Sequence, residues 1–370
     1  MAKGIGGFID ANDNFEKWLG DNVAIDVKGL KKKHEKMSED AFPFLRATYF
    51  RWAATIETLC PELAKAPAVL SVGDIHIENY GTWRNVEQRL VWGINDFDEA
   101  ARMPYAFDLV RLVTSARLAT AKKKLPRKAI ARAVLEGYRF GLKRAHPTLL
   151  DARQVWMNRY LLTTDEERLE FRDDMAELKR KDGLAEKDVP PAARKGLIEA
   201  IPKGLEPEFA QRRAGVGSLG RPRFVGIAEW YGGLVVREAK AQLSSAWDWA
   251  HGRPDAKSRL IEAARQPTRS PDPYLEADGD FVFRRLAADA DKIGVDQLDK
   301  AALQANLFGA MGFDLGAFHG SDRKDARAIE RDLRRRKDVG WLHHAADAAE
   351  ELVKADYRAW TKVHPRKNKK

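Results

Sequence analysis

The chain has 370 residues, of which 44% are hydrophobic, so it can bury a sizeable core and is long enough for two lobes. Its net charge of +10 favours anionic partners, and its single cysteine excludes an intrachain disulfide and fits a reducing compartment. Because we find no membrane-length apolar run, signal-peptide core or nucleic-acid motif, we expect a cytoplasmic protein without membrane or nucleic-acid partners.

In the first half of the chain, hydrophobic spacing predicts helices around one strand-rich unit. A mobile start and a short helix fall in residues 1–24, and further helical patterns fill residues 25–66. Residues 67–98 are predicted to form a strand–loop–strand unit. A mostly buried helix is expected over residues 105–121, and more helix over residues 126–163.

The second half begins with residues 164–206, whose dense mixed charge and capping signal predict a helical, solvent-facing connector. Residues 207–250 are rich in strand patterns and turns. The remaining predictions are a helix and Pro-rich turn over 253–273, a short strand at 281–286 that could be a hinge between lobes, and helices over 297–319 and 325–362.

Oxygen-bearing side chains follow both apolar runs of the strand–loop–strand unit. Asp74 and Asn79 come after the first run, and Asp96 and Asp98 after the second. Short β-rich runs that end in acidic residues are typical of buried strands that deliver carboxylates to a cleft. Hard oxygen ligands of this kind suit Mg²⁺ bound together with nucleotide phosphates. The five-residue spacing from Asp to Asn, with a further Asp-Phe pair downstream, has the layout of a kinase catalytic loop.

The two segments GDIHIENYG (73–81) and INDFDEA (94–100) resemble the GDxHxxN and IDFxxA motifs of a known superfamily. They are similar to the aminoglycoside and choline phosphotransferase branch of the protein-kinase-like superfamily. A closer resemblance is to an uncharacterised bacterial family, domain-of-unknown-function family 2252, which also shares the segments at 37–46 and 106–112. The similarity runs over most of residues 25–325 and is most specific in the first 120 residues.

The resemblance implies a role for each side chain of these segments. Asp74 would be the catalytic base, while Asn79 and Asp96 would bind Mg²⁺. Asp98 is either a further metal ligand or an ion-pair partner. His76 is interpreted as structural support that ties the loop to its surroundings.

Two residues further along the chain extend the resemblance. Asp108 would brace the backbone of the catalytic loop from the helix behind it, although a local ion pair with Arg111 is the alternative. His319 resembles the end of the helix that ordinarily leads into a kinase catalytic loop, and is interpreted as a packing residue.

The nucleotide-binding parts of a kinase normally precede the catalytic loop, but here their candidates follow it. Gly215, Gly217, Ser218 and Gly220 belong to a GxGxxG segment that leads into strand patterns at 224–230 and 234–237. Backbone amides of such a loop can approach phosphate oxygens closely. A glycine loop that leads into strands fits a kinase nucleotide lid better than a dinucleotide-binding turn, which should open a helix.

Arg237 and Lys240 are the candidate cations for the nucleotide phosphates. The resembling family tends to have Lys at the place of Arg237, and Lys240 would lie on the opposite face of a continuous strand. Glu262 is the candidate helix glutamate that would position this cation; an exposed helix residue is the alternative.

These features predict an α+β, protein-kinase-like two-lobe fold that is circularly permuted, with a mostly helical catalytic lobe and a small antiparallel-sheet nucleotide lobe. The predicted division is 1–206 for the catalytic part and its connector, 207–290 for the nucleotide lid, and 291–370 for helices that return to the catalytic lobe.

The predicted function is transfer of a phosphoryl group from Mg²⁺–ATP to a hydroxyl of an unidentified acceptor, either a small molecule or a protein. Attack at the α-phosphate is a related possibility. The alternative is a catalytically inactive member of the same fold that binds nucleotide or a partner. A binuclear metallophosphoesterase is disfavoured, because its additional Asp-x-His and Gly-Asn-His motifs are missing from the sequence.

Overall fold

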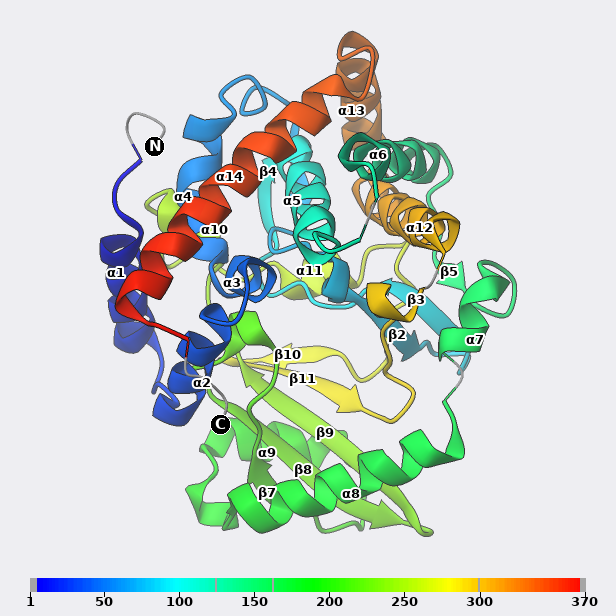
Figure 1. The fold of residues 1–370 in the computed structure, drawn as a ribbon. Helices are drawn as coiled ribbons and strands as arrows, with labels where there is room; N and C mark the ends of the chain where they lie inside the picture. Colours follow the sequence, from blue (N-terminus) through cyan, green and yellow to red (C-terminus); the bar gives the residue numbers. More distant parts are fainter. Residues whose placement is uncertain (1–4, 124, 162, 299, 367–370) are drawn as a thin grey trace.

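The structure, a computed structural model, describes residues 5–123, 125–161, 163–298 and 300–366. The predicted ranges 1–24, 126–163 and 297–319 therefore include a few positions outside the described part. The fold is mixed α+β, and the strands described pair antiparallel in small sheets. Figure 1 shows the largest sheet below most of the helices.

Helices from both ends of the chain build the larger, helical lobe. Those of the first half are α1 (Phe8–Asn22), α2 (Val27–Met37), α3 (Ala41–Ala47), α4 (Tyr49–Leu59), α5 (Tyr105–Ala119) and α6 (Arg127–Lys143). Those of the C-terminal part are α12 (Ala301–His319), α13 (Arg323–Arg335) and α14 (Gly340–Val363). Nearly every residue of α5 is buried, including Asp108 and Arg111, so this helix runs through the centre of the helical region. Phe8, Leu112 and Trp360 share one core, so α1 and α14 close on the same centre as α5.

Two small sheets hold the acid-bearing segments inside this lobe. β1 (Ala68–Ser71) pairs with β4 (Ala101–Pro104), while β3 (Leu90–Ile94) pairs with both β2 (Tyr80–Arg84) and β5 (Thr148–Leu149). The loop that carries Asp74 joins β1 to β2, and the loop that carries Asp96 joins β3 to β4. Because β2 and β3 run antiparallel, the two loops emerge side by side, and the amide of Asn95 donates to the carbonyl of Asn79 at 3.0 Å.

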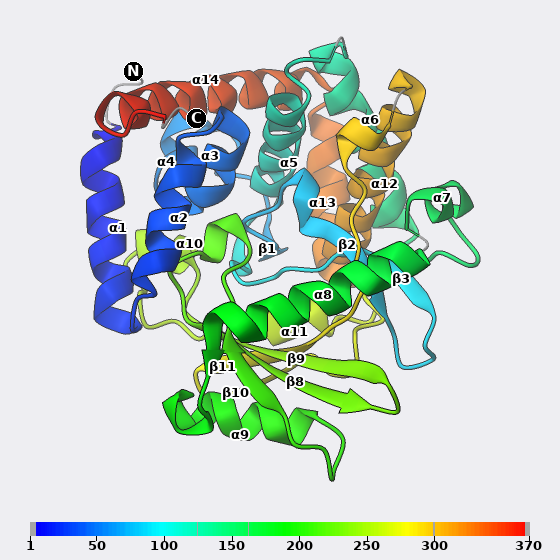
Figure 2. The ribbon, with the colours of Figure 1, turned by 60° about the horizontal axis from the view of Figure 1, so that its bottom comes forward.

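The largest sheet of the described residues has six strands in the order β10-β11-β9-β8-β7-β6. Its strands are β6 (Gly183–Leu184), β7 (Glu208–Gln211), β8 (Arg223–Trp230), β9 (Gly233–Ala241), β10 (Glu276–Asp278) and β11 (Phe281–Leu286). Figure 2 shows α8 (Asp165–Asp182) and α9 (Pro191–Ala200) on opposite sides of this sheet. Successive side chains of β8 pack against different helices. Val225 packs on the side of Met175 in α8, whereas Phe224 packs on the side of Leu197 in α9.

Several predicted elements are confirmed, and others differ at their ends. The strands at 223–230 and 281–286, the buried helix after residue 104 and the capping box at Thr164 are present. The helix predicted over 126–163 ends at Lys143, and the one over 325–362 is interrupted between Arg335 and Gly340. α8 and α9 pack on the six-stranded sheet, although the predicted division placed them in the catalytic part.

The strand predicted at 281–286, which was also considered as a hinge, is β11 and lies between β10 and β9 in the sheet. The chain crosses to the helical region in the next segment, where the Thr82 hydroxyl donates to the Asp289 carbonyl at 2.7 Å and accepts from the Asp291 amide at 2.8 Å.

Three short helices complete the described elements: α7 (Asn158–Leu161), α10 (Ala246–Ala250) and α11 (Leu260–Ala264). Among the described helices, none combines the length and the apolar character needed to cross a bilayer.

Candidate functional site

A cavity of about 320 Å³ lies between the six-stranded sheet and the two acid-bearing loops. Its lining includes most of the side chains that the sequence singled out, namely Asp74, His76, Asn79, Asp96, Asp98, Gly215, Gly217 and Ser218. Segments far apart in the chain therefore face one space. Lys240 reaches the same space through an ion pair with Asp98, whereas Gly220 is not among the described lining residues and lies against Leu30 of α2.

The loop before Asp74 is held from behind by Asp108 on α5. The Asp108 carboxylate accepts the amide of Val72 at 2.7 Å and that of Gly73 at 3.0 Å. His319, at the end of α12, lies with its Nε2 3.2 Å from the same carboxylate. Asp108 thus braces the loop backbone in the way the resemblance implied, and His319 takes part in that support.

Asp74 pairs with Arg111, a contact that sequence reasoning missed. Arg111 donates from Nε and Nη2 to Asp74 Oδ1 at 3.0 and 2.5 Å, and its guanidinium lies about 5 Å from the rings of Tyr49 and Trp52. Burial raises the pKa of Asp74, and the charge of Arg111 acts against that rise. One carboxylate oxygen is therefore fixed, while Oδ2 faces the glycine loop.

Asn79 and Asp96 supply an amide oxygen and a carboxylate to the cavity. Asn79 donates its Nδ2 to the carbonyls of Asp74 and Asp96 at 3.0 and 3.2 Å, which directs its own oxygen away from both. The Asp96 side chain is 44% exposed in the cavity. Burial acts to raise the pKa of Asp96, but the charges of Lys240 and Arg284 outweigh it and lower the pKa. An ionised carboxylate beside a neutral oxygen is a donor set that suits Mg²⁺.

Asp98 forms an ion pair with Lys240, whose Nζ also lies 3.7 Å from Asp96 Oδ2. Arg221 lies 3.9 Å from Asp98 and 2.8 Å from Glu99. Burial and the charge of Asp96 raise the pKa of Asp98, with Lys240 opposing them. In this structure Asp98 therefore acts as an ion-pair partner, the second of the two roles considered for it.

The glycine loop approaches the loop that carries Asp74 so closely that a side chain at Gly217 would force neighbouring atoms to shift. A Cβ on Gly217 would lie 3.0 Å from the Arg46 carbonyl and 3.2 Å from Asp74 Oδ2. Gly215 and Gly220 have φ angles of +75° and +96°, in the region that favours glycine. The Ser218 hydroxyl accepts a hydrogen bond from Arg223 at 2.6 Å, so the loop is tied to the start of β8.

Arg237 and Glu262 are not brought to the cavity. Successive residues of β9 point to opposite faces, so Lys240 faces the cavity while Arg237 faces α9, where it donates to the Ala200 carbonyl at 2.9 Å and stacks on Tyr274. Glu262 pairs with Arg259 at 2.6 Å on α11, and half of its side chain is exposed. Of the two candidate cations, Lys240 is therefore the one that lies beside the cavity, and Glu262 is an exposed helix residue.

A buried carboxylate on the same face of β9 was not predicted. Glu238 accepts from Arg212, just after β7, at 2.6 Å, and from Arg223 of β8 and Arg284 of β11, the two neighbouring strands, at 3.1 and 2.7 Å. Burial alone would raise its pKa, but these arginines hold it well below the ordinary value. Its position two residues before Lys240 was the signal in the sequence, since both must share one strand face.

His76 lines the cavity with an unsatisfied ring nitrogen. Only 8% of the residue is exposed, and its Nδ1 has no hydrogen-bond partner within the described ranges. Burial and the nearby cations Arg46, Lys292 and Arg111 place its pKa well below the ordinary value, so the ring is neutral at pH 7. The expected tie through a ring nitrogen is thus not formed at Nδ1.

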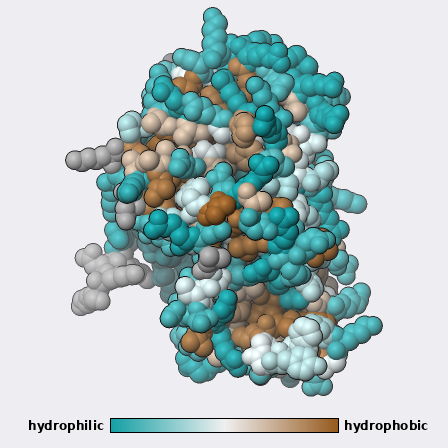
Figure 3. All heavy atoms as spheres, turned by 90° about the vertical axis from the view of Figure 1, so that its right-hand side faces the viewer, coloured by the Kyte–Doolittle hydropathy of each residue, from teal (hydrophilic) through white to brown (hydrophobic). Residues whose placement is uncertain are grey.

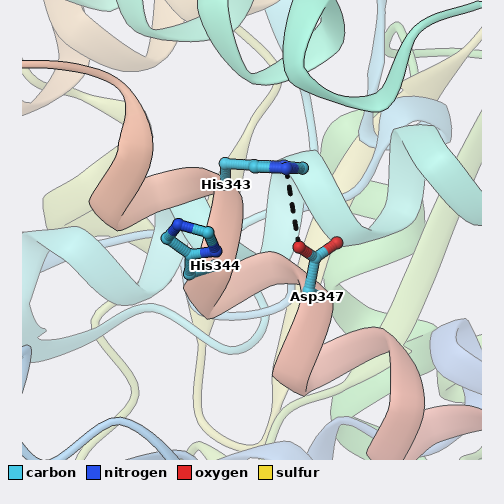
Figure 4. A group of neighbouring side chains, drawn as sticks. All are labelled: His343, His344 and Asp347. Atoms are coloured by element: carbon cyan, nitrogen blue, oxygen red, sulfur yellow. Dashed lines mark ion pairs between the residues drawn. The ribbon is translucent and has the colours of Figure 1, made fainter.

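Two other places were compared with this cavity. His343, His344 and Asp347 lie together on α14 (Figure 4), but Arg117 and Arg127 each donate to Asp347 at 2.9 Å, so two guanidinium groups occupy the position a metal ion would need. An open hollow of about 880 Å³ between α6 and α12 has one acidic side chain in its described lining.

Hydrophilic side chains cover most of the face in Figure 3, with small apolar groups between them.

Comparison with known proteins gives one match. Residues 27–188 match the model of a family described as an uncharacterized protein conserved in bacteria (DUF2252). The matched stretch contains both acid-bearing loops and Asp108, and it ends before the glycine loop. No curated protein and no solved structure matches the chain. Any functional argument must therefore come from the geometry of the site.

Proposed function

We propose that the protein is a phosphotransferase that moves the γ-phosphoryl group of Mg²⁺–ATP to a hydroxyl of an acceptor molecule. One observation carries the proposal: the glycine loop and Lys240 face Asp74, Asn79 and Asp96 across a single cavity, although they come from distant parts of the chain. A phosphate-binding loop, a lysine and a metal-binding carboxylate around a candidate base are the recurring parts of kinase active sites.

The proposed fold is kinase-like, with a circularly permuted chain. Counted from the strand before the glycine loop, Lys240 lies on the third strand, as the phosphate-binding lysine of protein kinases does. α12 ends at His319, beside Asp108 and the catalytic loop, yet it comes after that loop in the sequence. Both facts support an exchange of the two halves of the chain.

In the proposed reaction, the acceptor hydroxyl oxygen forms a bond to the γ-phosphorus while the bond from that phosphorus to the β–γ bridging oxygen breaks. The electron pair of the broken bond leaves with the nucleoside diphosphate, and the hydroxyl proton passes to Asp74 Oδ2, the oxygen that faces the glycine loop. Arg111 holds Oδ1 and so fixes the direction of Oδ2. Asn79 and Asp96 would hold Mg²⁺, which supplies charge neutralisation for the phosphates when bound.

The substitution Asp74→Asn tests this proposal, because the amide oxygen can still accept from Arg111 while the group can no longer take a proton. We expect phosphate release from Mg²⁺–ATP, with water in place of the acceptor, to fall by about 10²–10⁴-fold. Glu262→Gln, on the exposed surface of α11, is the matched control and should keep the full rate. An unchanged rate in Asp74→Asn, with thermal unfolding like that of the control, would refute the assignment of the base.

A catalytically inactive nucleotide-binding module is the second candidate, and the ion pairs of the site favour it. Lys240 is engaged by Asp98 and would have to leave it to contact nucleotide phosphates, and the charge of Arg111 lowers the pKa of Asp74 and so weakens it as a base. If ATP with Mg²⁺ raises the melting temperature while no phosphate is released, the inactive module is the correct description.

A further inference from the structure

Glu78 lies between two cations at the outer side of the catalytic loop. Arg46 Nη1 is 2.6 Å from the Glu78 carboxylate, and Lys292 Nζ donates to the Glu78 carbonyl at 2.5 Å. These three residues and His76 all line the cavity. The group also adjoins the base, because the backbone of Arg46 and the carboxylate of Asp74 both touch Gly217.

Arg46 has more hydrogen-bonding capacity than the protein satisfies. Its side chain is 14% exposed, and its Nε is buried without a partner in the part of the chain the structure describes. His76 Nδ1, on the same cavity wall, is also unpartnered. Buried polar groups without partners are costly, so an unpaired N–H of Arg46 and an unpaired ring nitrogen of His76 in one cavity indicate that a ligand completes the site.

The Glu78 side chain occupies the place such a ligand would take. It is 43% exposed, and the loop uses its backbone carbonyl, not its carboxylate, to hold Lys292. A carboxylate so lightly held can be displaced from Arg46 by a stronger anion. Two cations and a neutral imidazole would then surround the incoming group, whereas a cationic acceptor would meet both positive charges.

We propose that Arg46, Lys292 and His76 form an anion subsite, and that the acceptor is a hydroxyl compound carrying a phosphate or carboxylate group held there beside Asp74. The role of acceptor rests on the proposed phosphotransfer, but the binding of the anion does not. Glu78 acts as an internal competitor for this subsite.

Binding without nucleotide provides the first test, with inorganic phosphate and the pair glycerol 3-phosphate and glycerol as probes, measured by calorimetry and thermal shift. We expect inorganic phosphate and glycerol 3-phosphate to bind and glycerol not to bind. Arg46→Ala and Lys292→Ala should each weaken phosphate binding about tenfold, the loss of one charge-assisted hydrogen bond. Arg89→Ala, which removes an exposed cation paired with Asp151, is the control and should have no effect.

Glu78→Gln distinguishes a competitor from an anchor, because it removes the charge and keeps the backbone carbonyl that holds Lys292. The subsite predicts tighter phosphate binding by several-fold. Weaker binding in Glu78→Gln, or no phosphate binding to the wild-type protein at millimolar concentration, would overturn the proposal. Lys292→Ala, at an exposed position, keeps the test valid if Arg46→Ala does not fold.

A second arm separates the acceptor from the terminal phosphate of the nucleotide. With a non-hydrolysable ATP analogue present, glycerol 3-phosphate should still bind. Arg46→Ala should have the same small effect on the affinity for the analogue as on the affinity for ADP. If the two ligands exclude each other and Arg46→Ala weakens only the analogue, the subsite belongs to the nucleotide and the acceptor assignment fails. Anion binding without any ATP response would instead leave the subsite intact and refute the phosphotransferase.

Discussion

Glu238 shows how a single residue organises the wall of the cavity that the sheet provides. Its carboxylate is fully buried and bonds to Arg223 of β8, Arg284 of β11 and Arg212, which directly follows β7. Without it, three guanidinium groups would face one another across the sheet. Removing one partner of a buried ionic group leaves the remaining charge uncompensated, and this is costly.

We expect Glu238→Gln to lower the free energy of unfolding by about 3 kcal/mol at pH 7, measured by urea denaturation. Because the arginines hold the pKa of folded Glu238 well below 4.5, its contribution is fully present above the ordinary glutamate pKa. The difference from wild type should vanish only as pH falls through the lower folded value. Glu276→Gln, on the exposed strand β10, is the control, and equal stability of both variants would contradict the ionic cluster.

At the scale of elements, the alternation of side chains along β9 determines which basic residue lies beside the cavity. Its alternation turns Lys240 towards Asp96 and Asp98, and Arg237 towards α9. We expect Lys240→Met to abolish the thermal stabilisation by Mg²⁺–ATP. Arg237→Met removes a cation three residues away on the other face and should keep that response, even if its own melting temperature falls. Loss of the response in both variants would mean that the face of β9 does not matter.

How far the sequence predicted these elements depends on whether the signal was local. The strands around the glycine loop and the helix that carries Asp108 were found from patterns within a few residues. The choice between Arg237 and Lys240 stayed open, because it depends on the pairing of β9 with its neighbours. Spacing could place Glu238 on the strand face of Lys240, but it could not identify its three arginine partners, since these meet only after the sheet forms.

Arg111 illustrates the same limit inside a helix. Its spacing from Asp108 allowed a local ion pair, but backbone amides of the catalytic loop already occupy the Asp108 carboxylate. Arg111 therefore turns to Asp74 and to the carbonyl of Leu45. Only the three-dimensional arrangement of α3, α5 and the loop shows this preference.

At the scale of the whole molecule, α6 and α12 cross with their backbones in contact. A Cβ on Gly312 would lie 2.1 Å from the Val134 carbonyl, and one on Gly316 would lie 2.1 Å from the Tyr138 carbonyl. This crossing positions α12, which carries His319 to Asp108 and Asp314 to the end of β3. Glycine at the crossing thus fixes the distance between the helices that support the catalytic loop.

We expect Gly312→Ala to lower the free energy of unfolding by roughly 2–3 kcal/mol, because the added methyl group would overlap backbone. Gly309→Ala, one turn earlier, meets its nearest atom at 3.8 Å and should be neutral or stabilising by up to about 1 kcal/mol. Chemical denaturation of the two variants measures the difference. If both behave alike, the helices do not cross as closely as described.

The distance along the chain between Asp108 and His319, 211 positions, has a consequence for biosynthesis. At about 5–20 residues per second, a ribosome would need roughly 10–40 s to make the second residue after the first. During that interval the nascent polypeptide carries the reactive loop without its final support. Premature termination anywhere before α12 should therefore leave the Asp74 loop without the support of His319, which becomes available only after α12 has been synthesised.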